Sequence, residues 1–189
     1  MSAAWPTSPL AGIRVLDFSR VLAGPFCTMM MGDMGAEVLK IEEPDRGDDT
    51  RYWGPPFLPH REGGGQESAY FLSVNRNKKS VTLNLKSAEG REIARRLAAV
   101  SHVLVENFRP GTMERLGLGF EQLRPLNPRL VYCSVSGFGQ TGPDRERPGY
   151  DAVIQGEAGL MSVTGFPDAP PVKVGIALAD VVAGHYALQ

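Results

Sequence analysis

Apolar and polar residues along this chain alternate in short blocks that predict strands and helices in turn. Residues 13–18 form an apolar run typical of a buried strand, and residues 36–41 form a second one. Between them, Pro25 suits the first turn of a helix because its nitrogen has no hydrogen to donate, and the glycines that follow predict a helix end near Met34. These blocks predict a β-α-β unit, which is typical of a parallel sheet.

The same alternation resumes after a long stretch, residues 42–77, that is rich in glycine, proline and charge. A loop of this length within a compact domain is usually functional or disordered. Beyond it the pattern predicts strands at 80–85, 102–105 and 130–136, helices at 87–100, 111–117, 120–126 and 151–161, an extended run at 172–178 and a final helix. Ser87 is the expected N-cap of the helix that follows it.

The predicted fold class is therefore α/β, with a Rossmann-like, open, mostly parallel sheet flanked by helices. Ligands of such sheets bind beyond the carboxyl ends of the strands. This rule places residues 19–24, 42–43, 107–109 and 136–139 around one crevice.

Charge and cysteine content exclude several classes of partner and site. The chain has 20 basic and 21 acidic residues, whereas nucleic-acid binding normally needs a basic excess on one face. Cys27 and Cys133 lie in apolar runs without a CxxC pair or a histidine ladder, so we expect free thiols, no metal site and a reducing cytoplasm. Residues 21–31 form the longest nearly uncharged stretch, and a membrane span needs about 20 residues, so no membrane is expected.

Two familiar α/β activities are disfavoured by the motifs. The first strand-to-helix turn, residues 19–25, contains one glycine instead of the GxGxxG of dinucleotide-binding proteins. A Ser-His-Asp hydrolase is disfavoured because no GxSxG is present and the three histidines are scattered.

Basic residues at 76–79, with Arg109 and Arg115, form either a solvated face or a site for a phosphorylated ligand.

Several motifs along the chain resemble those of the class III coenzyme A transferases, the CaiB/BaiF type. They are RVLAGPF at 20–26, GDMGAEVLKIE at 32–42, NRNKKS at 75–80, VENFRPG at 105–111, SGFGQTGP at 136–143 and GYD at 149–151. The motifs follow the family order, and the resemblance runs from about residue 10 to the last residue.

The resemblance implies that Asp180 is the catalytic nucleophile, because the family's G-x-A-x-x-D motif falls at residues 175–180. Asp180 would also act as a helix N-cap, where the helix dipole keeps a carboxylate ionised. The implied reaction moves CoA from an acyl-CoA to a carboxylic acid through an aspartyl-CoA thioester. Coenzyme A and acyl-CoA enter as substrates, and no permanently bound cofactor is expected.

The resemblance also implies which residues bind CoA. These are Val21, Leu22 and Ala23 at the exit of the first strand, Leu83 and Lys86 near the nucleotide, Asn107 and Phe108 at the adenine, and Arg115 at a phosphate, with Arg109 and Tyr150 beside family binding positions. Two positions depart from some members. Glu43 replaces a basic residue and cannot bind a phosphate, and Leu22 replaces a glutamine, which suggests a different acyl or acceptor pocket.

The family also contains α-methylacyl-CoA racemases, whose histidine acid/base group would fall at Tyr150. A tyrosine there favours transfer, and racemisation remains the alternative. Residues 47–57 look most like members that act on succinyl-CoA and small dicarboxylates such as glutarate.

Family members are longer than this chain and form interlocked homodimers. Residues 1–189 are therefore expected to form a single, incomplete CoA-binding α/β domain that carries the catalytic aspartate, with the second domain absent. A further alternative is a truncated, catalytically poor module that binds CoA or a partner protein.

Overall fold

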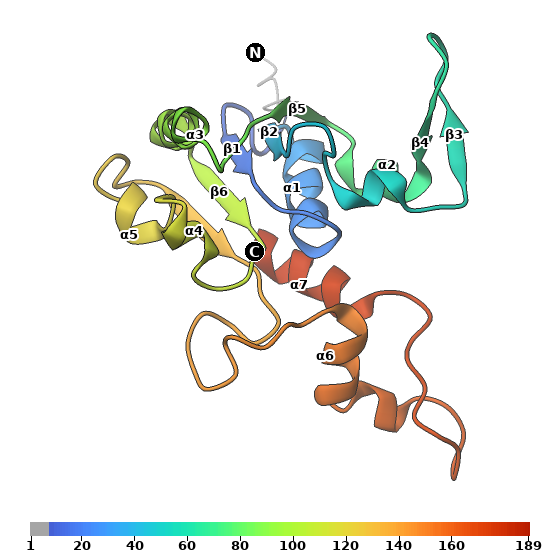
Figure 1. Cartoon of the computed structure of the whole chain (residues 1–189). Helices are drawn as coiled ribbons and strands as arrows, with labels where there is room; N and C mark the ends of the chain where they lie inside the picture. The colour runs from blue at the N-terminus through green and yellow to red at the C-terminus, as the bar shows by residue number, and fades with distance from the viewer. Residues whose placement is uncertain (1–7) are drawn as a thin grey trace, which may run out of the picture.

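A computed structural model describes residues 8–189 and confirms the α/β class (Figure 1). Its main sheet is five-stranded, with the order β5-β2-β1-β6-β7, and all of its neighbouring strands are parallel. The strands are β1 (Arg14–Asp17), β2 (Glu37–Glu42), β5 (Lys78–Thr82), β6 (Val103–Glu106) and β7 (Val131–Ser134). The order places β1 at the centre, so the segment that follows β1 leaves from the middle of the carboxyl edge.

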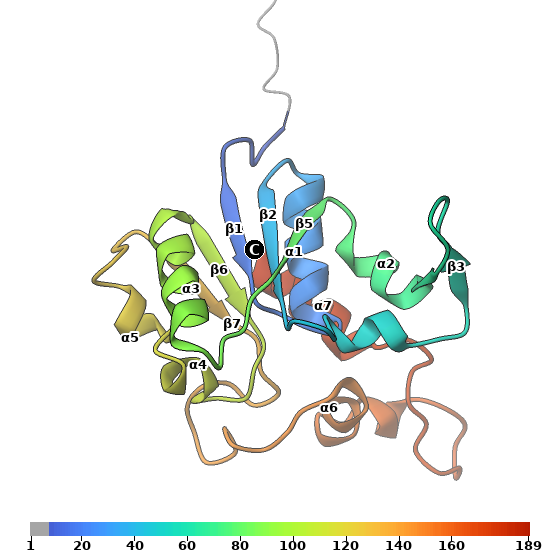
Figure 2. The ribbon, with the colours of Figure 1, turned by 45° about the horizontal axis from the view of Figure 1, so that its top comes forward.

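Helices cover both faces of this sheet (Figure 2). The helices α3 (Ala88–Val100), α4 (Thr112–Arg115) and α5 (Phe120–Leu123) cover one face, and α1 (Ala23–Asp33) and α7 (Leu178–Leu188) cover the other. Side chains of a strand alternate between faces. Leu16 accordingly packs with Ala94, Ala98 and Leu104 under α3, whereas Val15 packs with Cys27 and Met31 of α1.

The predicted β-α-β unit and the helix after Ser87 are confirmed. Helix α1 begins at Ala23, so that Pro25 lies in its first turn, and β2 follows at Glu37. Ser87 caps α3 by accepting a hydrogen bond from the backbone nitrogen of Gly90 at 3.0 Å. Both features depend on residues close in sequence, which is why the pattern finds them.

Residues 42–77 are more ordered than the pattern indicates. They contain a 3-10 helix (Asp49–Tyr52), the antiparallel pair β3 (Phe57–Pro59) and β4 (Gln66–Ser68), and α2 (Ala69–Asn75). Figure 1 shows the β3–β4 hairpin projecting from the body of the molecule. Arg51 fixes its base, because the guanidinium lies 2.7 Å from Glu42 and 2.6 Å from Glu67.

Several predicted boundaries differ from the structure. The strand expected at 80–85 lies at Lys78–Thr82, where it pairs in parallel with β2. The helix expected at 151–161 splits into α6 (Asp151–Glu157) and a 3-10 helix (Leu160–Val163) after Gly159, which has a positive φ of 82°. The run expected to be extended at 172–178 has no regular secondary structure up to residue 177, and α7 begins at its last residue, Leu178.

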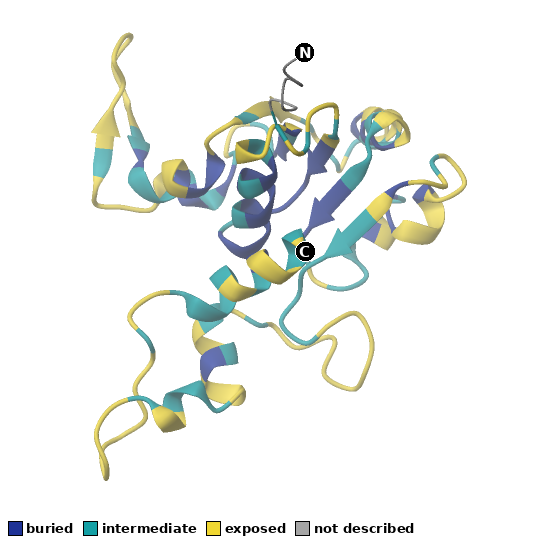
Figure 3. Cartoon of the chain, turned by 180° about the vertical axis from the view of Figure 1, so that it is seen from behind, coloured by how far each residue is buried: buried dark blue, intermediate teal, exposed yellow. Residues whose placement is uncertain are grey.

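The segment from α6 to the start of α7 stands away from the sheet, and most of it is exposed (Figure 3). Its large apolar side chains include Val163, 81% exposed, and Phe166, 87% exposed. Among residues 8–189, no helix has the length and apolar character needed to cross a membrane.

Candidate active site

A cavity of about 470 Å³ lies beyond the carboxyl ends of β1, β6 and β7. Its walls come from the segments after these strands and from the first turns of α1, α6 and α7. They are formed by Arg20, Val21, Leu22, Ala23, Asp49, Asn107, Phe108, Arg109, Pro110, Val135, Ser136, Gly137, Arg147, Pro148, Gly149, Tyr150, Ile154, Ala179, Asp180 and Ala183. This position agrees with the rule for ligands of open parallel sheets.

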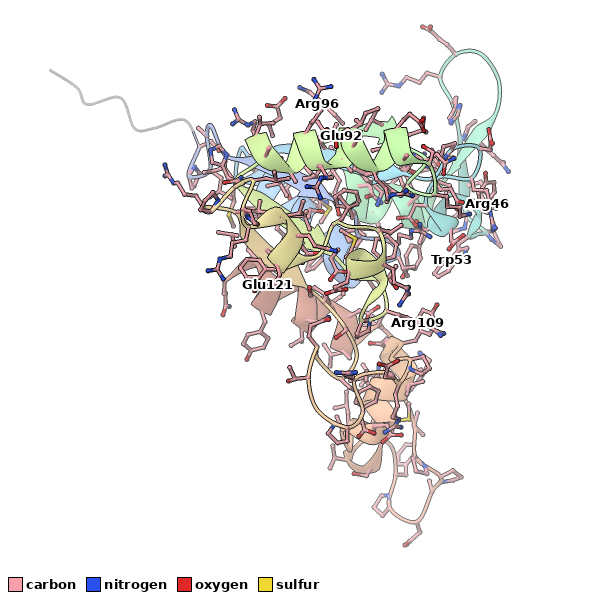
Figure 4. All side chains as sticks on the ribbon, turned by 60° about the vertical axis from the view of Figure 1, so that its left-hand side comes forward. Arg46, Trp53, Glu92, Arg96, Arg109 and Glu121 are labelled. Carbon is pink, nitrogen blue, oxygen red and sulfur yellow. The ribbon has the colours of Figure 1, made fainter. Side chains whose placement is uncertain are left out.

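Most of the side chains singled out in the sequence meet at this cavity. They are Val21, Leu22, Ala23, Asn107, Phe108, Arg109, Tyr150 and Asp180. Figure 4 shows Arg109 on the segment after β6, on the side of the molecule that faces α6. Segments far apart in sequence thus line one space.

Three predicted CoA-binding residues lie outside the cavity walls. Leu83 packs against the core beneath α3. Lys86 is 85% exposed and pairs with Glu43 at 3.0 Å, so it is engaged by the acidic residue that departs from the family pattern. Arg115 donates a hydrogen bond to Thr112 Oγ1 at 2.9 Å within its own helix.

The structure also places on the cavity wall Arg20, which lies in the 19–24 stretch expected at the crevice but was not named as a binding residue, and Arg147. Arg20 adjoins Val21 in the first motif, so its position in the sequence was a usable signal. No signal in the sequence pointed to Arg147, because its place at the cavity depends on contacts with Glu157 at 2.6 Å and with the Phe138 ring at 4.6 Å.

The segment after β1 is held in place by Asn107. The side chain of Asn107 accepts from the backbone nitrogen of Arg20 at 2.8 Å and donates to the Arg20 carbonyl at 2.7 Å. The Arg20 guanidinium lies 5.0 Å from the centre of the Phe108 ring. Val21 follows with a φ of 67°, a strained conformation for a β-branched residue. Strain of this kind persists only where the surroundings impose it, and it is common at functional sites.

Buried ion pairs support the same segment from below. Asp17 is fully buried, its Oδ2 lies 3.0 Å from Lys78 Nζ, and the Thr28 hydroxyl donates to it at 2.6 Å. Lys40 lies 2.9 Å from Asp48 and donates to the Ser19 carbonyl at 2.7 Å. Both lysines therefore fix the backbone that leads into the cavity.

These contacts determine the charge state of Asp17. Burial by itself raises the pKa of Asp17, but the charges of Lys78 and Lys40 and hydrogen bonds from Ser19 and Thr28 outweigh burial and bring the pKa to about 2. Asp17 is therefore a charged structural group at neutral pH.

The loop between β7 and α6 closes at its base through two glycines. A Cβ built on Gly137 would lie 2.5 Å from the Cα of Gly149, and a Cβ built on Gly149 would lie 2.5 Å from the Cα of Gly137. Residues with side chains do not fit at these positions. The backbones of the two loop ends thus meet directly at the cavity wall.

Asp180 lies in the first turn of α7, as expected, but it does not cap the helix. Ala177 is the N-cap, and the side chain of Asp151 accepts from the backbone nitrogens of Ala179 at 2.8 Å and Asp180 at 3.3 Å. Burial, and to a smaller extent the nearby charge of Asp151, raise the pKa of Asp180 to about 6. The helix dipole was expected to keep Asp180 ionised; burial instead shifts its pKa upward, and the side chain bonded to the positive end of the helix is Asp151.

The site also has features suited to an anionic, polar ligand. The Arg20 and Arg109 side chains lie on its wall, and neither forms an ion pair within the part of the chain that the structure describes. The Ser136 hydroxyl is buried there without a hydrogen-bond partner among the described residues. Such groups are costly to leave unpaired, and a bound ligand can satisfy them.

A sequence model of CoA-transferase family III matches residues 10–189. The chain belongs to this family. The recognition made from the motifs is therefore confirmed.

Relatives within family III extend this result. The chain is 52% identical to a succinyl-CoA:glutarate CoA-transferase of Homo sapiens over 95% of its own length and 40% of that protein. It is 49% identical to a succinate–glutarate CoA-transferase of Agrobacterium fabrum over 96% of its length and 45% of that protein. The crystal structure of a CaiB/BaiF family protein from Brucella suis superposes with a TM-score of 0.92 at 48% identity, covering 96% of this chain and 47% of that one. The chain thus spans less than half the length of these relatives.

Proposed function

We propose that this chain is the CoA-binding, nucleophile-bearing part of a class III CoA-transferase that transfers CoA from an acyl-CoA, such as succinyl-CoA, to a carboxylic acid. The observation that carries this proposal is the position of Asp180 on the wall of the cavity that the Arg20 and Asn107 segments also line. The names of the relatives, which act on succinyl-CoA with glutarate, support the same substrate class.

In the proposed reaction, a carboxylate oxygen of Asp180 attacks the thioester carbon of the acyl-CoA. The carbon–sulfur bond breaks, leaving a mixed anhydride on Asp180 and a CoA thiolate. The thiolate then attacks the aspartyl carbonyl carbon, the acyl group leaves as a free carboxylate, and an aspartyl-CoA thioester remains. The acceptor acid reverses these steps, takes the CoA and regenerates Asp180.

The residues of this chain have distinct parts in that sequence. Asp180 must be deprotonated to attack, and a pKa of about 6 leaves it mostly ionised at neutral pH while giving it more basicity than an ordinary carboxylate. Arg20 and Arg109 supply positive charge for the phosphates and carboxylates of the substrates. An anhydride hydrolyses readily, so the cavity must exclude water during the reaction.

Of the two alternatives, the racemase fits the site less well and the binding module fits it equally. A racemase needs a second acid/base group, and within the described part of the chain no histidine lines the cavity, where Tyr150 occupies the family's histidine position. A CoA- or partner-binding module without activity would use the same cavity, so only an assay of Asp180 chemistry separates it from the enzyme. The single incomplete domain, the interlocked homodimer and the cytoplasmic location stay predictions.

The test traps the intermediate on the full polypeptide in which these residues occur. After incubation with succinyl-CoA, hydroxylamine should convert Asp180 to a hydroxamate that peptide mass spectrometry locates. Asp180→Ala should abolish both the hydroxamate and the transfer of CoA to glutarate. The matched control is Asp168→Asn, an exposed aspartate outside the cavity, which should retain both. Transfer by Asp180→Ala at the wild-type rate would eliminate the proposal.

A further inference from the structure

Two side chains of α6, to which the sequence motifs gave no role in the reaction, form hydrogen bonds with the first turn of α7 and with the segment that leads into it. We propose that Asp151 and Gln155 are positioning residues that hold the first turn of α7, and with it the Asp180 carboxylate, in the orientation needed for attack. This inference rests on the proposed function, because it concerns how the same nucleophile is presented.

Asp151 is a capping side chain supplied from another helix. The N-cap residue of α7 is Ala177, which has no side-chain acceptor for the free backbone N–H groups of the first turn. Asp151 Oδ1 accepts from Ala179 and Asp180 instead, at 2.8 and 3.3 Å. The backbone nitrogen of the nucleophile itself is therefore bonded to α6, which fixes where its side chain begins.

Gln155 holds Asp151 and also the chain that leads into α7. It is one turn after Asp151, and its side chain is 1% exposed. Its Nε2 donates to Asp151 Oδ2 at 2.6 Å and to the Ile176 carbonyl at 3.2 Å, and its Oε1 accepts from the Val174 nitrogen at 2.8 Å. Both polar atoms of the buried Gln155 amide are therefore bonded, and these bonds connect α6, residues 174–176 and, through Asp151, α7.

Residues 165–177 form no helix or strand, and many of them are exposed. At the end of this segment Ala177 packs against the apolar cluster of Leu22, Met29 and Val74. The Gln155 and Asp151 contacts add the polar connection between α6 and the start of α7. Loss of either contact loosens the first turn of α7, and a misplacement of about 1 Å at a reacting group costs on the order of a hundredfold in rate.

The surrounding charges show that Asp151 also acts on Asp180 electrostatically. Asp151 faces Asp180 from α6. Tyr70 of α2 is also close, because its pKa is raised by burial and, in addition, by the charges of Asp180 and Asp151. The other charged groups on the cavity wall are Asp49 of the 3-10 helix, Arg20, Arg109 and Arg147. Since Asp151 is the carboxylate in direct contact with the turn, its charge disfavours ionisation of Asp180.

Two substitutions separate the positioning of α7 from the electrostatic effect of Asp151 on Asp180. Gln155→Met keeps the side-chain length but removes the three hydrogen bonds, and should lower kcat for CoA transfer about ten- to a hundredfold with KM within about twofold. Asp151→Asn removes the charge and should move the acidic limb of the kcat profile to lower pH, because Asp180 then ionises more readily. Hydroxamate formation at Asp180 should slow in parallel with kcat in Gln155→Met.

The matched control is Gln122→Met at α5. Gln122 makes the same kinds of contact, accepting from Gly119 at 2.9 Å and donating to the Glu114 carbonyl at 3.1 Å, but it lies outside the cavity. It should lower the melting temperature and leave kcat and the pH profile unchanged. If Gln155→Met and Asp151→Asn behave as Gln122→Met does, the two residues are only structural and the proposal is wrong. A change in KM alone also overturns it.

The wild-type protein gives a measurement that requires no variant. The carboxyl ¹³C chemical shift of Asp180 should titrate with a pKa well above the ordinary aspartate value. A titration of Asp180 at the ordinary aspartate value would overturn the electrostatic part of the proposal. This measurement does not depend on transfer activity, so it distinguishes a failure here from a failure of the proposed function.

Discussion

Asn107 and Arg20 are joined by a pair of hydrogen bonds, 2.8 and 2.7 Å long, between one side-chain amide and both backbone polar groups of the arginine. The pair connects the end of β6 to the segment after β1, and it holds Val21 in its strained conformation. The family resemblance assigns Asn107 to the adenine, whereas these bonds show that much of its hydrogen-bonding capacity orders the protein itself.

Replacing Asn107 by leucine should weaken CoA binding by about tenfold, because loss of the two bonds frees the Arg20–Leu22 segment. Calorimetric titration with CoA measures the change. The matched control is Asn127→Leu, which removes bonds to the Ala98 and Ser101 carbonyls away from the cavity and should lower stability alone. Equal losses of CoA affinity in both variants would contradict this prediction.

Replacing Lys78 by methionine should lower the free energy of unfolding by about 3–5 kcal/mol, because it leaves the buried carboxylate of Asp17 without its partner. The neighbouring Lys79 provides the control. Its side chain is 72% exposed and pairs with Glu37 at the surface, so Lys79→Met should change stability by less than about 1 kcal/mol. Urea unfolding of the two variants tests the contrast, which fails if their midpoints coincide.

Acid should destabilise the protein between about pH 4 and pH 2. The folded-state pKa of Asp17 is about 2, below the ordinary value of 3.8, so its contribution is present above the unfolded pKa and is lost as pH falls through the folded one. The loss from Asp17 amounts to about 2 kcal/mol, measurable as a shift in urea midpoint. Asp17→Asn should flatten this dependence, and the exposed Asp144→Asn should retain it; identical slopes would refute the assignment.

Asp180 should have the opposite effect on stability. Its folded-state pKa is raised to about 6, so ionisation opposes folding; this cost is absent below the unfolded pKa, grows as pH rises and is complete above pH 6. Asp180→Asn should therefore stabilise the protein by about 1–3 kcal/mol at pH 8 and have little effect below pH 4. Melting temperatures at both pH values test this. A destabilised variant at pH 8 would show that the carboxylate is well accommodated.

The sequence pattern identified what depends on neighbours along the chain. Ser87 and Pro25 signal helix starts by their own chemistry, and the apolar runs at β1 and β2 need only a sheet to bury them. The hairpin at residues 57–68 escaped notice because Arg51 fixes it through Glu42 and Glu67, a contact between three separate segments.

In the candidate site, too, the features with a local sequence signal were predicted and the contacts between distant residues were not. The motif located Asp180 near the start of a helix, but its role as the helix cap was misjudged, because the side chain that caps the first turn is Asp151, 29 residues earlier. Lys86 and Glu43 were considered separately in the sequence, whereas the structure pairs them at 3.0 Å. Pairings across such distances are set by the fold and have no local pattern.

The contact between Gly137 and Gly149 makes the intervening loop a replaceable module. Because its two ends meet at the backbone, residues 138–148 can change in length or composition while β7 and α6 keep their places, and lengthening a surface loop costs little conformational entropy. Arg147 belongs to this module and reaches the cavity. Exchange of this loop between homologues would therefore change the side chains on that wall of the cavity without moving β7 or α6.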